Sequence, residues 1–151
     1  MTFQKLKSYF ISEEKIAELL NYLSENYFDV IDKIKEDYIA DIISTPDELK
    51  ETKRILQGMI SSLEPIYSKS LSLKKQEEYR YYVLKKEKCE KDGTKFTDGS
   101  TTVEAKDFVR NYRDVRDIIR GYLNSASGLY YDIRDTLDRM RIDYSKTKEN
   151  N

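Results

Sequence analysis

Apolar residues recur every three or four positions through the last third of the chain, which indicates one long amphipathic helix. The stripe consists of Ala105, Phe108, Tyr112, Val115, Ile119, Tyr122, Ala126, Leu129, Ile133, Leu137, Met140 and Tyr144. Thr101 and Glu104 precede it at the spacing of a capping box, so we expect a helix over 101–144. Its roughly 40 residues would extend about 60 Å. A stripe this narrow is typical of a coiled-coil seam, which needs a partner helix to bury it.

A second helix is predicted over 12–43, and its carboxylates outnumber its lysines. Ser12 is a suitable N-cap, and Glu13 and Glu14 follow it at the positive end of the helix dipole. The apolar stripe again has a spacing of three and four: Ile16, Leu20, Leu23, Tyr27, Val30, Ile34, Tyr38 and Ile42. The helix must end before Pro46, because a residue that precedes proline is disfavoured in the helical conformation.

A third helix is predicted over 46–92. Thr45 supplies an N-cap, Pro46 suits the first helical position, and Glu48 completes a capping box. Pro65 either kinks this helix or divides it into two, and the apolar periodicity that resumes at Ile66 favours the kink. A loop follows over 93–100.

These patterns predict an all-α fold in a single domain over 1–151. We expect elongated antiparallel helices in which 46–92 and 101–144 form a coiled-coil hairpin about the 93–100 loop, followed by a flexible tail over 145–151. The seam predicts a homo-oligomer, formed through residues of the last helix. These are Phe108, Tyr112, Val115, Ile119, Tyr122, Leu129, Ile133, Leu137 and Met140.

The composition excludes several kinds of chemistry. The chain has no histidine and a single cysteine, Cys89, so it offers no histidine-based catalytic triad, no intramolecular disulfide and no metal site built from several thiolates. The carboxylates lie on helix faces that are expected to be solvated, which argues against metal binding and acid–base catalysis. We therefore expect no catalytic residue, no cofactor and no metal. The sequence also shows neither a signal peptide nor a membrane span, so a cytoplasmic protein is expected.

Charge is unevenly distributed along the chain. Residues 12–51 contain 12 acidic and 4 basic side chains, whereas residues 69–95 contain 9 basic and 5 acidic ones. These segments would attract each other, or the matching faces of neighbouring copies. Alternatively, both are ordinary solvated helix faces.

The basic segment carries the strongest candidate site. On a helix, Lys75, Tyr79, Tyr82 and Lys86 form one stripe, and Tyr81, Lys85 and Lys88 form a second beside it. Together with Arg80 they could bind single-stranded nucleic acid, since cations neutralise phosphates and aromatic rings stack on bases. In the alternative interpretation, the tyrosines pack against a neighbouring helix and the lysines cover apolar surface.

Arginines of the last helix form a second candidate. Arg110, Arg113, Arg116 and Arg120 could contact phosphates. The pattern more strongly favours a solvated face with i,i+4 ion pairs, namely Arg110–Asp114, Arg113–Asp117, Arg134–Asp138 and Asp135–Arg139.

The region 66–144 resembles the UvsY-type recombination mediators of bacteriophages. The resemblance rests on three segments: Tyr79-Arg80-Tyr81-Tyr82-Val83-Leu84-Lys85-Lys86, the loop with Asp92-Gly93-Thr94 and Asp98-Gly99, and the final helix with Thr102-Val103-Glu104-Ala105-Lys106 and Thr136-Leu137-Asp138-Arg139-Met140-Arg141. It implies a non-enzymatic protein that binds single-stranded DNA in the cytoplasm of the infected host. Its implied partners are a recombinase and a single-strand-binding protein. The alternative is a helical structural or assembly protein of a phage, which docks protein partners and has no nucleic-acid role.

Overall fold

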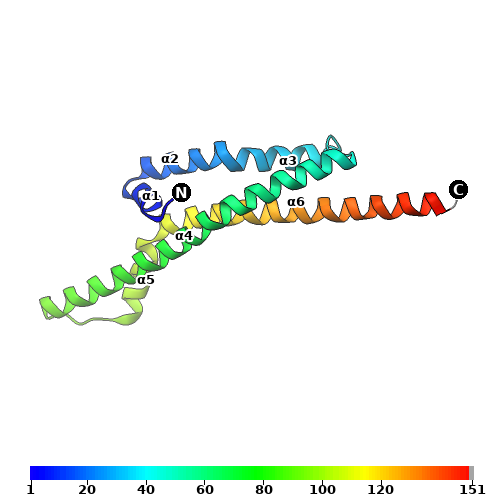
Figure 1. Ribbon diagram of the computed structural model, residues 1–151. Coiled ribbons are helices and arrows are strands. Elements are labelled where there is room, and N and C mark those ends of the chain that lie inside the picture. The colour runs from blue at the N-terminus through cyan, green and yellow to red at the C-terminus, as the bar shows by residue number, and fades with distance from the viewer. Residues whose placement is uncertain (150–151) are drawn as a thin grey trace. The chain divides into compact units, whose positions relative to one another are not determined.

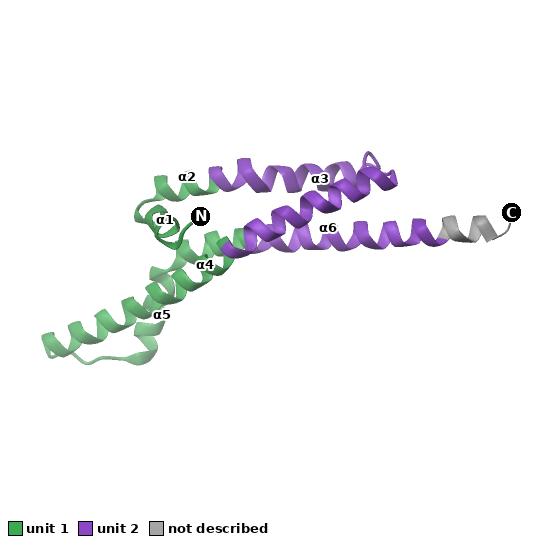
Figure 2. Cartoon of the chain, in the orientation of Figure 1, with its two compact units in different colours: residues 1–20, 66–119 green, residues 21–65, 120–151 purple. Residues whose placement is uncertain are grey.

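The computed structural model describes residues 1–149, and side chains within 1–142, as a set of helices (Figure 1). In order they are α1 (Phe3–Ser8), the 3-10 helix η1 (Tyr9–Ile11), α2 (Glu13–Leu23), the π-helix η2 (Ser24–Phe28), α3 (Asp29–Ile39), α4 (Pro46–Asp92), α5 (Asp98–Phe108) and α6 (Arg110–Glu149). This confirms the all-α class. The chain forms two compact units, unit 1 with residues 1–20 and 66–119 and unit 2 with residues 21–65 and 120–151 (Figure 2).

The helix predicted over 12–43 is three elements, and the middle one changes the register. Ser12 caps α2 as expected, because its Oγ accepts a hydrogen bond from the Lys15 amide at 3.3 Å. The π-helix η2 then accommodates one extra residue. The buried stripe therefore steps from Leu23 to Phe28 and on to Ile31, rather than to Tyr27 and Val30. The α-helical period used for the prediction is wrong at this turn.

Helix α4 begins where the sequence predicts and continues through Pro65 without dividing. The Thr45 amide donates to Glu48 at 3.0 Å and the Glu48 amide donates to Thr45 Oγ1 at 3.4 Å, so this capping box is confirmed. One buried stripe follows the helix at spacings that fit a heptad repeat. The α4 stripe consists of Leu49, Thr52, Leu56, Leu63, Ile66, Ser70, Leu73 and Glu77.

The helix predicted over 101–144 is divided at Val109, which joins α5 to α6 with φ −94° and ψ 19°. The capping box predicted for Thr101 and Glu104 is wrong, because α5 already begins at Asp98. The Thr101 hydroxyl instead donates to the Thr97 carbonyl at 2.9 Å. Helix α6 continues to Glu149, so residues 145–149 of the predicted tail are helical. The rest of that tail, 150–151, and the side chain of Tyr144 lie outside the described residues.

Unit 2 is built from α3 and the adjoining parts of α2, α4 and α6 around one apolar core. The core side chains are Leu23, Phe28, Ile31, Ile34, Leu49, Leu56, Leu63, Leu123, Ala126, Leu129 and Ile133. The ring of Phe28 stacks on Tyr122 with centroids 3.9 Å apart, and the Tyr122 hydroxyl donates to Asp32 at 2.9 Å. Tyr122 of α6 thus makes an apolar contact with η2 and a polar contact with α3.

Unit 1 packs α1, the C-terminal part of α4, α5 and the start of α6. Its buried side chains include Leu6, Leu19, Ile66, Leu73, Ala105, Val109, Val115 and Ile119. Phe10 stacks on Tyr112 with centroids 4.2 Å apart, and Lys69 donates to the carbonyl of Met1 at 2.6 Å. These contacts attach the first eleven residues to α4 and α6, which the sequence analysis did not predict.

The end of α3 has a specific backbone conformation. Asp41 has a φ of 55°, in the left-handed region. The Ile42 amide donates to the Asp37 carbonyl at 2.9 Å and the Asp41 amide to the Tyr38 carbonyl at 3.3 Å, which together form a Schellman motif. Glycine is the usual residue at this left-handed position, and aspartate tolerates it better than most others.

We expect replacement of Asp41 to depend on the backbone conformation that the new residue can adopt. Asp41→Val should lower the free energy of unfolding by about 1–2 kcal/mol, because a β-branched residue is strained at positive φ. Asp41→Gly should lower it far less or raise it. Urea denaturation of the two variants checks this, and equal losses in both would contradict the assignment of a left-handed residue.

Candidate nucleic-acid interface

The eight candidate residues for nucleic-acid binding lie on α4 within unit 1, where they divide between faces. Lys75, Tyr79 and Tyr82 line an open groove of about 260 Å³ together with Glu78, Thr102 and Ala105; we call it the aromatic groove. Tyr81, Lys85 and Lys88 line a second groove of about 300 Å³ with Leu84; we call these four residues the basic patch. The structure therefore separates the two stripes that the helical spacing predicts.

The aromatic groove contains one free ring and one fixed ring. The Tyr79 side chain is 71% exposed. Tyr82 is held in place, since its hydroxyl donates to Asp98 and its ring meets Phe96 edge-on with centroids 5.6 Å apart. The hydrogen bond to Asp98 raises the pKa of Tyr82, so this phenol stays protonated at neutral pH.

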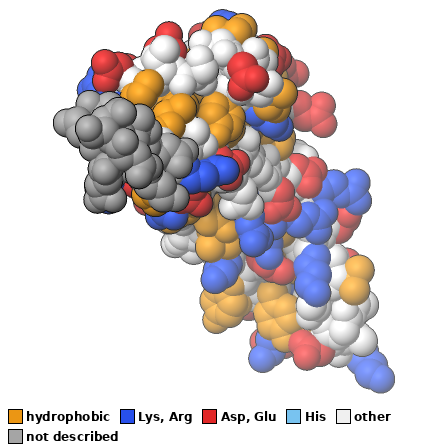
Figure 3. All heavy atoms as spheres, turned by 90° about the vertical axis from the view of Figure 1, so that its right-hand side faces the viewer, with side chains coloured by type: hydrophobic (Ala, Val, Ile, Leu, Met, Phe, Trp, Pro, Cys, Tyr) orange, Lys and Arg blue, Asp and Glu red, His pale blue; other side chains and the backbone are white. Residues whose placement is uncertain are grey.

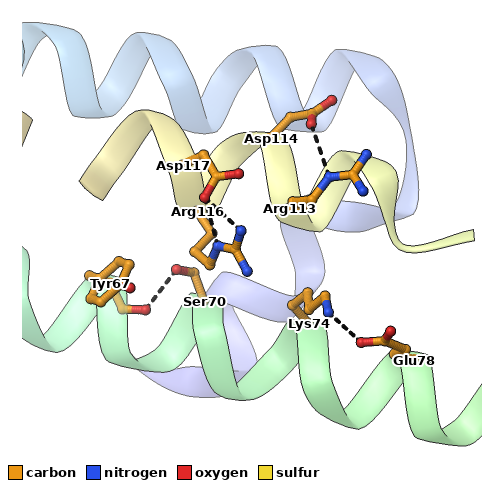
Figure 4. Close-up of polar contacts among 8 residues, drawn as sticks. All are labelled: Tyr67, Ser70, Lys74, Glu78, Arg113, Asp114, Arg116 and Asp117. Carbon is orange, nitrogen blue, oxygen red and sulfur yellow. Dashed lines mark hydrogen bonds and ion pairs between the residues drawn. The ribbon is translucent and has the colours of Figure 1, made fainter. Parts of the chain in front are cut away.

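Charge in the aromatic groove is locally positive. Glu78 is paired with Lys74 one turn earlier on α4, which neutralises its carboxylate (Figure 4). Lys75 makes no ion pair with any residue that the structure describes, and the same holds for Lys86 further along α4. Ammonium groups without a carboxylate partner remain available for an anion such as phosphate.

The basic patch is tied to α5 by a small polar network. Tyr81 stacks on Phe108 with centroids 4.9 Å apart, and its hydroxyl donates to Glu104 at 3.1 Å. Glu104 also pairs with Lys85 at 2.9 Å. Hydrogen bonds from Lys85 and Tyr81 lower the pKa of Glu104, and the bond to Glu104 raises the pKa of Lys85. Lys88 is exposed and has no ion-pair partner among the described side chains.

Glu77 is a buried carboxylate that the sequence analysis did not identify as part of the core. It is 2% exposed and lies between Lys7 at 2.9 Å and Arg80 at 2.6 Å. Burial alone would raise the pKa of Glu77, but the hydrogen bonds from Lys7 and Arg80 outweigh burial and lower it. Glu77 therefore stays ionised, holds α1 against α4, and occupies Arg80. Its position in the α4 stripe, four residues after Leu73, is the signal that could have identified it.

The arginines of α6 form ion pairs, but not the predicted ones. Arg110 pairs with Asp107, Arg113 lies 3.8 Å from Asp114, and Arg116 pairs with Asp117 at 2.6 Å. Figure 4 shows Arg116 projecting from α6 toward α4.

Further along α6, Arg134 pairs with Asp135 at 2.9 Å. None of the four predicted i,i+4 pairs is present within the described residues. Neighbouring aspartates one and three positions away compete for the same guanidinium groups, and sequence spacing does not rank them.

The predicted oligomerisation seam is packed largely inside the protomer. Val115, Ile119, Leu129 and Ile133 are at most 8% exposed. Tyr112 and Tyr122 stack on Phe10 and Phe28 respectively, and Leu137 and Met140 are half-buried. Phe108 alone of the nine is largely exposed, at 46%. The partner helices that the seam requires are thus supplied by the same chain.

Two other kinds of functional feature are absent from the described part of the chain. Within it, no cluster of three or more acidic or cysteine side chains could hold a metal ion, and no helix is both long and apolar enough to cross a membrane. Cys89 is half-buried. Comparison with known protein families, with curated proteins and with solved structures finds no match to this chain.

We expect Glu77 to contribute stability that depends on pH. Because its pKa is lowered in the folded state, that stability is present at neutral pH and is lost as pH falls from about 4.3 toward the folded-state pKa. Glu77→Gln should lower the free energy of unfolding at pH 7 by about 1–3 kcal/mol, because it leaves Lys7 and Arg80 without their carboxylate. It should also reduce the further loss on acidification. Urea denaturation at several pH values measures both effects.

Glu90→Gln on the same helix is the matched control, since Glu90 is exposed and makes no ion pair within the described residues. If Glu77→Gln lost as much stability on acidification as the unmodified chain does, Glu77 would not be a group responsible for it.

Proposed function

We propose that this chain is a non-enzymatic single-stranded DNA-binding protein, of the kind that acts as a phage recombination mediator. The observation that carries the proposal is the exposed Tyr79 ring beside Lys75 in the aromatic groove. A ring that is exposed on a helix presents a face on which any base can stack, and an adjacent ammonium neutralises the neighbouring phosphate.

The proposed mode of binding uses the aromatic groove and continues to Lys86. A base stacks on Tyr79, while the fixed ring of Tyr82 forms one wall of the groove. Lys75 and Lys86 neutralise phosphates along the strand. Lys85 and Arg80 contribute less, because Glu104 and Glu77 already pair with them.

A groove with one free ring and two available ammonium groups binds weakly in a single copy. Several copies in one assembly would multiply that affinity through effective concentration. This fits the homo-oligomer expected from the sequence, although the surfaces that join copies must differ from the buried α6 seam. We also propose that the segments 46–92 and 101–144 form a coiled-coil hairpin about the 93–100 loop. The recombinase and the single-strand-binding protein enter as partners through the resemblance to UvsY-type mediators.

A second candidate function is favoured by a different observation. Arg80, Tyr81, Tyr82 and Lys85 are all held by contacts within unit 1, as expected of a helical assembly protein whose charged side chains stabilise its own fold. Such a protein would dock other proteins and would have no nucleic-acid role. The two proposals differ in whether the chain binds DNA at all.

We expect Tyr79→Ala to weaken binding to an oligo-dT of about 30 nucleotides by roughly 1–3 kcal/mol, since the ring on which one base stacks is removed. The double variant Lys75→Glu/Lys86→Glu should abolish measurable binding at near-physiological salt. The slope of log affinity against log salt should also fall by about 0.7 for each phosphate that the variant no longer neutralises. Fluorescence anisotropy over a salt series measures both quantities, and circular dichroism verifies that the helices remain.

The matched controls are Tyr131→Ala and Lys5→Glu/Lys35→Glu. Tyr131 is 53% exposed, and both lysines are exposed without an ion-pair partner in the described chain. These variants should bind as the unmodified protein does. Absence of binding by the unmodified protein at low salt would refute the DNA-binding proposal and favour the assembly protein. Equal losses of oligo-dT affinity in the test and control variants would show that the aromatic groove is not the binding site.

A further inference from the structure

Two isoleucines are exposed where α3 turns into α4 in unit 2. Ile39 is 71% exposed and Ile42 is 64% exposed. The Schellman motif fixes Ile42 in this position, since its amide is bonded to the Asp37 carbonyl and its side chain projects from the turn. Isoleucine gains nothing from solvent exposure, so their joint exposure marks a surface that another molecule can cover.

A groove of about 360 Å³ begins at Ile39, the first of the two isoleucines. It is lined by side chains that include Tyr38, Ile39, Ile43, Leu49 and Met140. The apolar surface therefore has depth, and an inserted side chain would gain contacts on several sides.

Two carboxylates lie near this apolar surface, and the exposed Lys35 lies one helical turn before Ile39. Glu36 and Asp41 are exposed and make no ion pair with the residues that the structure describes. Figure 3 shows hydrophobic and acidic side chains together in the upper part of the face that it draws. We call Glu36, Ile39, Asp41 and Ile42 the acidic patch.

The basic patch in unit 1 has the complementary composition. Leu84 is 54% exposed at its centre, with Lys85 and Lys88 on the same face of α4. Lys85 is paired with Glu104, so the positive charge of this face comes mainly from Lys88. Lys91 follows at the i+7 position from Leu84, which places it on the same face. Lysine stems extend the apolar area around Leu84 while their ammonium groups remain at its edge.

We propose that the acidic patch of one copy binds the basic patch of a second copy of this chain. Each patch has an exposed apolar centre whose burial is favourable, and the net charges around the two centres are opposite in sign. Opposite charges at the edge of an interface favour the correct partner and the correct orientation. The occupant is a second copy because one chain carries both complementary surfaces, whereas its long α6 seam is already filled from within the protomer.

The proposed contact joins two different surfaces, so it is heterologous rather than two-fold symmetric. After the first contact, one copy retains a free basic patch and the other retains a free acidic patch, so further copies can add until a ring closes or a filament grows. The contact uses the basic patch and leaves the aromatic groove free. The contact does not rest on the proposed DNA binding, and its loss would lower the DNA affinity that comes from several copies in one assembly.

Reversing the charge of each patch by mutation tests this inference. The variant Glu36→Lys/Asp41→Asn reverses the acidic patch, and asparagine tolerates the left-handed conformation of residue 41. The variant Lys85→Gln/Lys88→Glu reverses the basic patch by an equal amount of charge. Sedimentation velocity should show the unmodified chain as assemblies larger than 17.9 kDa that dissociate as salt is raised. Each variant alone should associate at least about tenfold more weakly, and an equimolar mixture of the two should recover assembly.

Two variants in which serine replaces an exposed apolar side chain test the same contact without changing charge. Ile42→Ser and Leu84→Ser should each weaken assembly, whereas Ile11→Ser should not, although Ile11 is 76% exposed. Circular dichroism confirms that each variant is folded. A monomeric unmodified chain at about 100 μM would overturn the proposal, as would assembly that survives either charge reversal. Failure of the mixed variants to recover assembly would also overturn it. The variants Glu36→Lys/Asp41→Asn and Ile42→Ser lie outside the candidate nucleic-acid residues, so they should lose assembly while retaining oligo-dT binding at low salt. Absence of oligo-dT binding by the unmodified chain would instead mark a failure of the proposed function.

Discussion

Burial of the α4 stripe is the constraint on which both units depend. Leu49, Leu56 and Leu63 contribute to the core of unit 2, and Ile66 and Leu73 contribute to that of unit 1. Each such side chain gains about 1.5–3 kcal/mol from leaving water. With a hydrophobic fraction of only 38%, the chain has few apolar residues to spare, so the other helices direct their own apolar stripes to this one. That requirement also explains why the α6 seam is filled from within the protomer.

Apolar periodicity was sufficient to predict the helical class and most of the buried positions on α6, and the capping residues around Pro46 were sufficient to predict the start of α4. It could not identify the partner of the seam, because a leucine gains the same free energy from a helix of its own chain as from another copy. The prediction from periodicity also assumed that every helical turn has about 3.6 residues. The division at Val109 and the π-helix after Leu23 depend on tertiary packing, and neither has a glycine or proline that would indicate it.

The sequence was sufficient to predict which residues form the candidate site and that they lie on two faces of a helix. The hydrogen bonds and ion pairs that these residues make are seen only in the structure. Contacts such as Tyr81 with Glu104 join residues on different helices, and helical spacing gives no information about them. The same applies to Lys7 and Glu77, which are 70 positions apart. As a result, the eight candidate residues are not equivalent. Four of them make hydrogen bonds or ion pairs within unit 1, and the other four remain available to bind a ligand: Lys75, Tyr79, Lys86 and Lys88.

The π-helix η2 has a consequence for how relatives of this chain could be compared with it. Because its turn holds one residue more than an α-helical turn, a protein with one residue fewer between Leu23 and Phe28 could bury the same two side chains on an uninterrupted α-helix. A single-residue gap in an alignment over 24–27 would then leave the core of unit 2 unchanged. Similar gaps in the middle of α4 would instead rotate every later position of its stripe by about 100°. Loss of one residue is therefore compatible with the fold in η2, whereas the same loss in the middle of α4 would disrupt the buried stripe.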